Sequence, residues 1–283
     1  MAFNAVLAKI LGDQMPWQVD HAVLMPMGLS GKQIANINYM LLANENQDSR
    51  WASAVDLQNL GLAPREGEKP THIVHWWKAR TAGEGDDVSQ LINTAAAVPV
   101  FNLAQVDHNL PTLSTQDALF SGIELQNLAK NAGVHLVFDE NDNELYLEDT
   151  VNVEFDNPTP DNVGLVIAGL VAWARDEHKL NIPANDTIGS KFLDAVAISM
   201  LASEYGVPVP AVVREELAAR KGELVAHLEA NPAVVLSVSR QAWEVRQFIN
   251  QYAPASVDEH KDGNTAYTDA SNRGLPSSPK TLY

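Results

Sequence analysis

The sequence contains no cysteine. Disulfide bonds, thiolate zinc sites and cysteine nucleophiles are therefore excluded, and such a chain suits a reducing compartment. It also lacks any apolar run near the ~18 residues that a membrane-spanning helix needs. Its start, residues 1–10, carries a lysine and is followed by no signal-peptide cleavage pattern. We expect a cytoplasmic protein, in the host cell if it is viral, that contacts no membrane.

Positive charge is scarce, with 19 lysines and arginines against 36 aspartates and glutamates and a formal net charge of -17. This balance argues against coating duplex DNA by charge alone, because phosphate binding uses clustered lysine and arginine. The distribution is uneven, since residues 28–80 hold six basic and five acidic residues, whereas no basic residue lies between Lys130 and Arg175. We expect a polyanion to bind the first of these regions only.

The spacing of apolar residues and turns predicts an α+β protein. The expected helices span residues 1–12, 34–42, 50–60, 119–132, 162–180, 187–205, 211–229 and 232–252. The expected strands span 71–78, 97–101, 134–138 and 144–147, the last two as a hairpin.

Three regions follow from this pattern. Residues 1–112 are expected to form a mixed helix and sheet domain that binds DNA, and residues 113–253 a hairpin plus a mainly helical domain. Residues 254–283 are rich in Ser, Pro, Asp, Asn and Gly, a composition that buries too little apolar surface to become ordered. We expect a mobile tail there.

Aromatic and basic side chains are interleaved in the first 110 residues. The rings are Trp17, Tyr39, Trp51, Trp76 and Trp77, and the cations are Lys32, Arg50, Arg65, Lys69, Lys78 and Arg80. An unpaired base stacks on an exposed ring while arginine or lysine holds its phosphate. The alternative for any one tryptophan is packing in a core. Because Trp76 and Trp77 are neighbours on a predicted strand, they point to opposite faces, so that at least one of them is expected to pack in the core and the other to be free.

Blocks of residues in this region also match a known family. In order, they are Pro16-Trp17, Pro26, Ser30-Gly31-Lys32, Ile37-Asn38, Trp51, Gln58, Leu60-Gly61, Arg65-Glu66-Gly67-Glu68-Lys69, Phe101-Asn102 and Gln105. They resemble the single-stranded-DNA-binding N-terminal domain of ArdC-type antirestriction proteins of plasmids and phages. The Gly-Glu-Lys turn followed by Phe-Asn-x-x-Gln is the most specific feature. Ala35 departs from the family pattern, which usually has glycine there, as do residues 62–64.

The resemblance implies binding of single strands. The amides of Asn38, Asn102 and Gln105 can both donate and accept, which suits base edges or sugars, and the cations Lys32, Arg65 and Lys69 suit phosphates. The alternative for the amides is hydrogen bonding within turns and at strand ends. Together with the rings, the candidate DNA contacts are Lys32, Asn38, Tyr39, Arg50, Trp51, Arg65, Lys69, Trp76, Trp77, Lys78, Asn102 and Gln105.

Full-length relatives of this family carry a zinc peptidase-like second half with a His-Glu-x-x-His helix. That chemistry needs two histidines one helical turn apart and a glutamate base. Residues 169–178 match that helix by position yet lack the motif, and Asp194 stands where the next helix would carry a pair of glutamates. The resemblance thus implies a degenerate second half, and we expect no metal, no cofactor and no enzymatic activity.

Three functions remain open. The first is a sequence-independent single-stranded-DNA-binding protein of a phage or mobile element. It would act in replication or transcription, like the phage cofactors that recruit RNA polymerase to melted DNA, or in antirestriction. Its partners would be single-stranded DNA and a phage or host RNA polymerase or replication protein. The second is a divergent metal-dependent hydrolase, and the third is an acidic protein that mimics DNA. Whether the chain forms a homo-oligomer is also open.

Overall fold

The computed structural model describes residues 2–43, 48–80, 91–109, 122–139, 144–148, 160–175, 180, 182 and 187–253. Within these ranges the side chains of 77–80, 91–93, 122–126, 135–139, 144–148 and 160–162 are not described. The architecture is α+β, which confirms the predicted fold class. The predicted tail, the loop at 81–90 and the hairpin turn at 140–143 lie outside the described residues.

The elements alternate in the first part of the chain and are mainly helical in the second. The helices are α1 (Ala2–Leu11), α2 (Ile37–Leu42), α3 (Ala54–Asn59), α4 (Gly122–Ala132), α5 (Pro160–Arg175), α6 (Ile188–Tyr205), α7 (Ala211–Ala219), α8 (Lys221–Ala230) and α9 (Val234–Asn250), with 3-10 turns η1 (Pro16–Gln18) and η2 (Leu103–Gln105). The strands are β1 (Met27–Gly28), β2 (Arg50–Ser53), β3 (Thr71–Arg80), β4 (Leu91–Asn102), β5 (His135–Asp139) and β6 (Glu144–Glu148).

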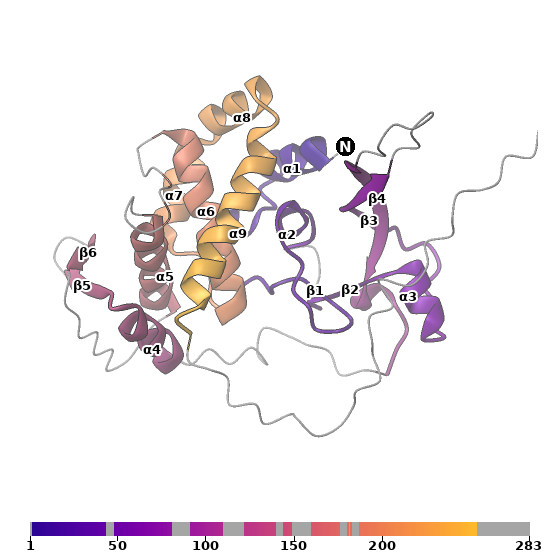
Figure 1. Cartoon of the computed structure of the whole chain (residues 1–283), viewed down its shortest axis with the longest axis horizontal. Helices are drawn as coiled ribbons and strands as arrows, with labels where there is room; N and C mark the ends of the chain where they lie inside the picture. Colours follow the sequence, from indigo (N-terminus) through magenta and orange to yellow (C-terminus); the bar gives the residue numbers. More distant parts are fainter. Residues whose placement is uncertain are drawn as a thin grey trace, which may run out of the picture.

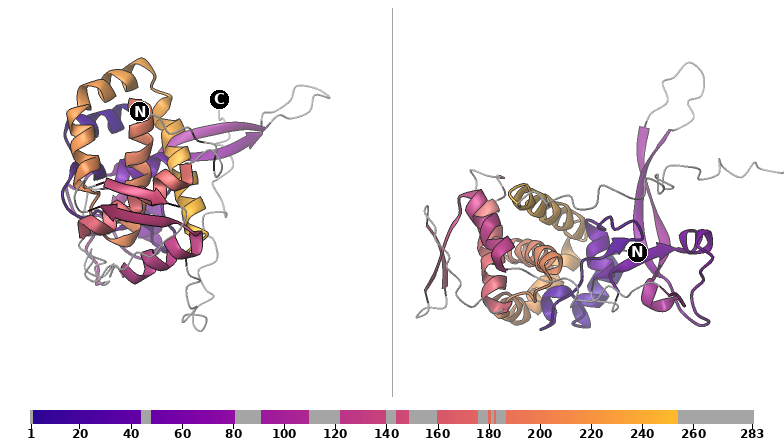
Figure 2. Two further views of the ribbon diagram at one scale, coloured as in Figure 1. Left: turned by 90° about the vertical axis from the view of Figure 1, so that its left-hand side faces the viewer. Right: turned by 90° about the horizontal axis from the view of Figure 1, so that it is seen from below.

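A four-stranded sheet with the order β1-β2-β4-β3 organises the N-terminal region. β1 pairs with β2 in parallel, and the other two pairs are antiparallel. β3 and β4 pair from Thr71 opposite Val100 out to Arg80 opposite Leu91. These two strands, called the ribbon below, extend well past β2 and project from the rest of the molecule (Figure 2).

Residues 50–53 form a strand, which corrects the helix predicted from residue 50 onward. Trp51 and Ala52 are both buried within the sheet, and burial on both faces favours a central strand over a one-sided helix. The helix starts only after Ser53, whose hydroxyl accepts the N–H of Asp56 at 3.1 Å. This is an N-terminal capping box, so that the sequence did contain the correct start signal.

Helices from both ends of the chain share one buried core. α1 and α2 lie between the sheet and the helices α5, α6 and α9 (Figure 1). Val6 and Met40 belong to the same buried cluster as Phe192 and Val245, and the ring of Trp17 meets that of Phe192 edge-on at 5.6 Å. The division at residue 112 stays a prediction, but it does not separate two cores.

Two polar contacts join the same parts. The hydroxyl of Tyr39 in α2 hydrogen-bonds with Ser203 in α6 at 2.8 Å. Burial raises the pKa of Tyr39 above its ordinary value, although hydrogen bonds with Ser203 and Ser199 act in the opposite direction. Nearby, Arg246 of α9 donates to Glu204 of α6, and Gln33 contacts both of these residues.

Other boundaries also differ from expectation. β4 begins at Leu91 rather than at residue 97, because pairing with β3 extends through a run of alanines that has little strand preference of its own. The helix predicted over 211–229 is two helices that meet at Arg220. None of the described helices is long and apolar enough to cross a membrane.

Candidate nucleic-acid interface

An exposed tryptophan lies on the ribbon. The side chain of Trp76 is 53% exposed, and its neighbour across the ribbon is Ala95, whose methyl group is too small to cover the indole ring. Neither β3 nor β4 contains an aspartate or glutamate, although the chain has 36 of them. A ring with an open face on an acid-free ribbon is suited to stacking against a base.

Three of the predicted contacts are buried, which corrects their assignment. Tyr39 has no exposed surface, Trp51 is sealed between Leu42 and Val100, and Asn102 is fully buried. The amide of Asn102 accepts the N–H of Ala104 at 2.9 Å and donates to the carbonyl of Asp48 at 2.7 Å. Their rings and amide are part of the scaffold and are not available to a strand.

The remaining amides also bond within the protein. Gln105 accepts the N–H of Asn102 at 2.9 Å and donates to Glu68 and to the carbonyl of Lys69, each at 3.0 Å. The turn at 65–69 is thereby tied to the end of β4, and Asn38 is tied to β3 in the same manner. The amides that carry the family resemblance therefore hold the sheet together, as the alternative interpretation of turn and strand-end bonding had it.

Arg50 does not offer a free charge. Its guanidinium donates to both carboxylate oxygens of Asp48, at 2.9 and 2.7 Å, and little of the side chain is exposed. Burial alone would raise the pKa of Asp48, but hydrogen bonds from the guanidinium and backbone N–H of Arg50 outweigh it and lower the pKa. The pair is neutral overall, so that Arg50 is a poor phosphate contact.

The exposed cations do not gather in one groove. Lys32 lies in the turn beside β1, at one edge of the sheet, whereas Lys69 precedes β3 at the other edge. Arg65 is partly exposed and paired with Glu68 at 3.1 Å. Within the described residues, neither lysine has a side-chain partner, so that both stay candidates for phosphate contacts. Trp77 and Lys78 lie on β3, but their side chains are outside the described residues.

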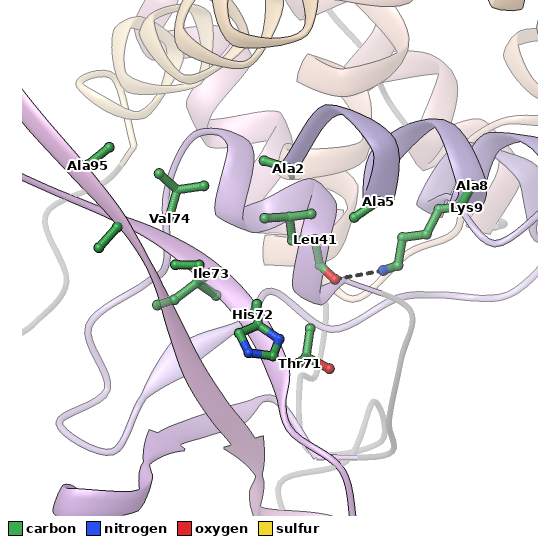
Figure 3. A pocket seen from close by; sticks show the side chains of 12 residues that line it. Ala2, Ala5, Ala8, Lys9, Leu41, Thr71, His72, Ile73, Val74 and Ala95 are labelled. Carbon is green, nitrogen blue, oxygen red and sulfur yellow. Dashed lines mark hydrogen bonds between the residues drawn. The ribbon is translucent and has the colours of Figure 1, made fainter.

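Alanines form a feature that sequence reasoning missed. Ala2, Ala5 and Ala8 of α1 and Ala95, Ala96 and Ala97 of β4 line one cavity. Figure 3 labels the three alanines of α1 and Ala95. The signal was present, because a spacing of three residues places alanines along one side of a helix and three alanines in a row interrupt the apolar strand. Small side chains were overlooked because they carry no chemistry of their own.

The comparison with protein families covers this region. A family model described as the N-terminal domain of anti-restriction factor ArdC matches residues 6–106. Residues 6–106 are thus similar to the ArdC N-terminal domain. The match includes the sheet, the ribbon and residues 6–11 of α1, so that Ala2 and Ala5 of the alanine-lined cavity lie just before it.

Relatives extend past residue 106. The metal-free crystal structure of antirestriction protein ArdC from plasmid R388 superimposes with a TM-score of 0.66 and 14% identity, covering 89% of this chain and 96% of that one. Its Mn(II)-bound structure gives 0.61 and 16%, covering 90% and 97%. The Escherichia coli protein DNA primase TraC is 22% identical over 91% of this chain. The chain spans only 28% of the length of TraC.

Beyond residue 106, the position where the resemblance predicts a degenerate metal site holds an ion pair. The side chain of Arg175 in α5 is buried and forms an ion pair with Asp194 in α6, and it also donates to the hydroxyl of Ser190 at 3.0 Å. Burial raises the pKa of Asp194, against the attraction of Arg175. No group of three or more metal-binding side chains occurs among the residues that the structure describes. The absence of a metal in the functional protein stays a prediction.

Proposed function

We propose that the protein binds single-stranded DNA along the ribbon and performs no chemistry on it. The observation that carries this proposal is Trp76, an exposed ring opposite Ala95 on two strands that lack any acidic residue. The rest of the chain is strongly acidic, and a polyanion is repelled by such a surface. Binding is therefore restricted to the ribbon and its surroundings.

Single strands fit this site better than duplex DNA. Base stacking on a ring requires a base whose face is uncovered, and in a duplex each base is stacked on its neighbours. Stacking is also tolerant of sequence because every base has a π-face. Few cations are available, so we expect a slope of log affinity against log salt of only about -1 to -3, from about -0.7 per phosphate neutralised on a single strand.

The biological role that we propose is handling of unpaired DNA during replication, transcription or transfer of a mobile element. The names of two similar proteins, an antirestriction protein of a plasmid and a DNA primase, support a role of this kind. Protection of incoming strands and recruitment of a polymerase to melted DNA both require a protein that holds a single strand without cutting it. RNA polymerase or replication proteins would be the partners in the second case.

The test is a titration of labelled single-stranded and duplex oligonucleotides at two salt concentrations. We expect the single strand to bind more tightly, and Trp76→Ala to weaken it by about 1–3 kcal/mol, the value of one stacked base. Leu236→Ala, which removes an exposed apolar side chain from α9, is the matched control and leaves affinity unchanged. A preference for duplex, or no binding at low salt, would contradict the proposal. Binding to a basic enzyme instead of DNA would favour a DNA mimic.

A further inference from the structure

A groove runs between α1 and the ribbon. Its volume is about 620 Å³, which lies within the ~300–1,000 Å³ typical of ligand pockets. Figure 3 shows the alanines of α1 along one wall and Ile73, Val74 and Ala95 along the other. The groove is open to solvent along its length, and its walls are lined mainly by methyl groups, which leave room for a planar ring.

The groove is continuous with the candidate interface. Alternate residues of a strand share a face, so that Val74 and Trp76 are on the same side of β3. Their partners across the ribbon, Ala97 and Ala95, both line the groove. Trp76 therefore lies at the outer end of the groove, one residue pair beyond Val74. For single-stranded DNA with one base stacked on the Trp76 ring, the groove is the adjacent surface.

The groove has one basic residue in its lining, and that residue is bonded to the backbone of α2. It is Lys9, and its ammonium group donates to the carbonyls of Leu41 and Ala43 at the end of α2, at 2.8 and 3.1 Å. No aspartate or glutamate is among the described residues that line the groove.

We propose that the groove between α1 and the ribbon accepts a nucleobase of the single strand whose neighbouring base stacks on Trp76. This inference rests on the proposed function and adds a second base contact to it. The base is held mainly by apolar contact with the alanine methyl groups, since Lys9, Thr71 and His72 are the only polar or charged residues among the described residues that line the groove. The contact is therefore insensitive to base identity and absent for a strand without bases.

The test fills the groove without disturbing the core. Ala5 is exposed on α1 and lines the groove, so that Ala5→Leu adds a side chain there at no cost in helix preference. Asn4→Leu adds the same side chain at an exposed position that does not line the groove, and is the matched control. Ala97→Val, on the opposite wall, fills the groove from the ribbon. Circular dichroism melts of each variant report whether the fold is kept.

Binding is measured by fluorescence anisotropy with thymidine oligonucleotides of roughly 20 nucleotides, longer than the ~4–16 that one binding fold covers, and with an abasic strand of equal length. We expect Ala5→Leu and Ala97→Val to weaken thymidine binding about tenfold, the effect of one lost base contact, and to leave the abasic strand unchanged. Asn4→Leu changes neither.

The outcomes separate the two proposals. Thymidine binding that depends on Trp76 but is unchanged by both groove variants overturns the groove and leaves the proposed function standing. Equal weakening of both strands also overturns it, because the groove would then act on the sugar-phosphate chain. If the unmodified protein binds no single strand at low salt, both proposals fail.

Discussion

The side-chain amide of Asn38 bonds to the backbone of Val74 on the edge of β3 that has no neighbouring strand. The amide donates to the carbonyl of Val74 and accepts the N–H of the same residue, each at 2.8 Å. β3 is the outermost strand of the sheet, and unpaired backbone groups at such an edge favour pairing with other chains. The Asn38 side chain thus makes the two hydrogen bonds that a neighbouring strand would make to Val74. Its chain neighbour, Tyr39, binds α6, so that α2 links the ribbon to the helices.

Replacement of Asn38 by alanine is expected to loosen the ribbon at its base. We expect a loss of about 1–3 kcal/mol in the free energy of unfolding, because both backbone groups of Val74 lose their partner. Amide exchange of Val74, followed by NMR, should become faster while that of Ile73 changes less. Asn59→Ala, at the exposed end of α3, is the control and stays within about 0.5 kcal/mol. Unchanged exchange at Val74 would rule the contact out.

Alkaline pH should weaken the contact between α2 and α6. The pKa of Tyr39 is raised by burial, so that the folded protein keeps this phenolic proton while the unfolded chain loses it above about pH 10. The stabilisation is complete below about pH 10 and is lost as the pH rises toward the folded-state pKa, by roughly 1.4 kcal/mol at about pH 11.

Urea unfolding of two variants tests this pH dependence. Tyr39→Phe removes the titrating group, so its stability should decline less steeply above pH 10 than that of the unmodified protein. Ser203→Ala removes the same hydrogen bond but keeps the phenol, and its alkaline decline should persist. Parallel pH curves for all three proteins would show that Tyr39 does not contribute.

The ion pair between α5 and α6 is expected to be costly to break from one side. Arg175→Met leaves the carboxylate of Asp194 without its cation, and we expect a loss of about 3–5 kcal/mol. The double variant Arg175→Met/Asp194→Leu should regain most of it, since two apolar side chains need no partner. Arg240→Met, at an exposed pair with Glu244, is the control and costs under about 1 kcal/mol. Equal losses at Arg175 and Arg240 would contradict this view.

Two glycines should respond to alanine in opposite directions. Gly61 follows α3 with φ of +70°, a conformation in which a side chain is strained, so Gly61→Ala should cost about 1 kcal/mol. Gly222 lies in α8 with open space around it, and alanine there should add up to about 1 kcal/mol. Thermal melting of both variants gives the signs directly. A stabilised Gly61→Ala would show that α3 ends differently.

Structural features that depend on a few neighbouring residues, such as helix ends and hairpins, could be predicted from the sequence. Gly61 predicted the end of α3, and the alternation around residues 135–148 predicted a hairpin that the structure confirms. β2 could not be predicted, because its short apolar stretch is compatible with a helix until the strands on both sides of it are known. The burial of Trp51 follows from that central position and from no property of its neighbours in the chain.

The candidate site was predicted in part for the same reason. Trp76 is exposed because Ala95, about twenty residues away in the sequence, lies opposite it, and this pairing depends on the register of the ribbon. Asn102 and Gln105 carry the resemblance to the family, yet this pattern of amides fits a scaffold as well as a binding site. Only their partners in space distinguish the two.

The core shared by α1, α2, α6 and α9 limits how such a protein can be rearranged. A recombination event that joined the ribbon region to an unrelated sequence would strip Tyr39 and Gln33 of the groups they bond to on α6 and α9. The ribbon is therefore not a cassette that can be inherited separately. Its descendants would be expected to carry a compatible helical layer, even where that layer has lost any activity of its own.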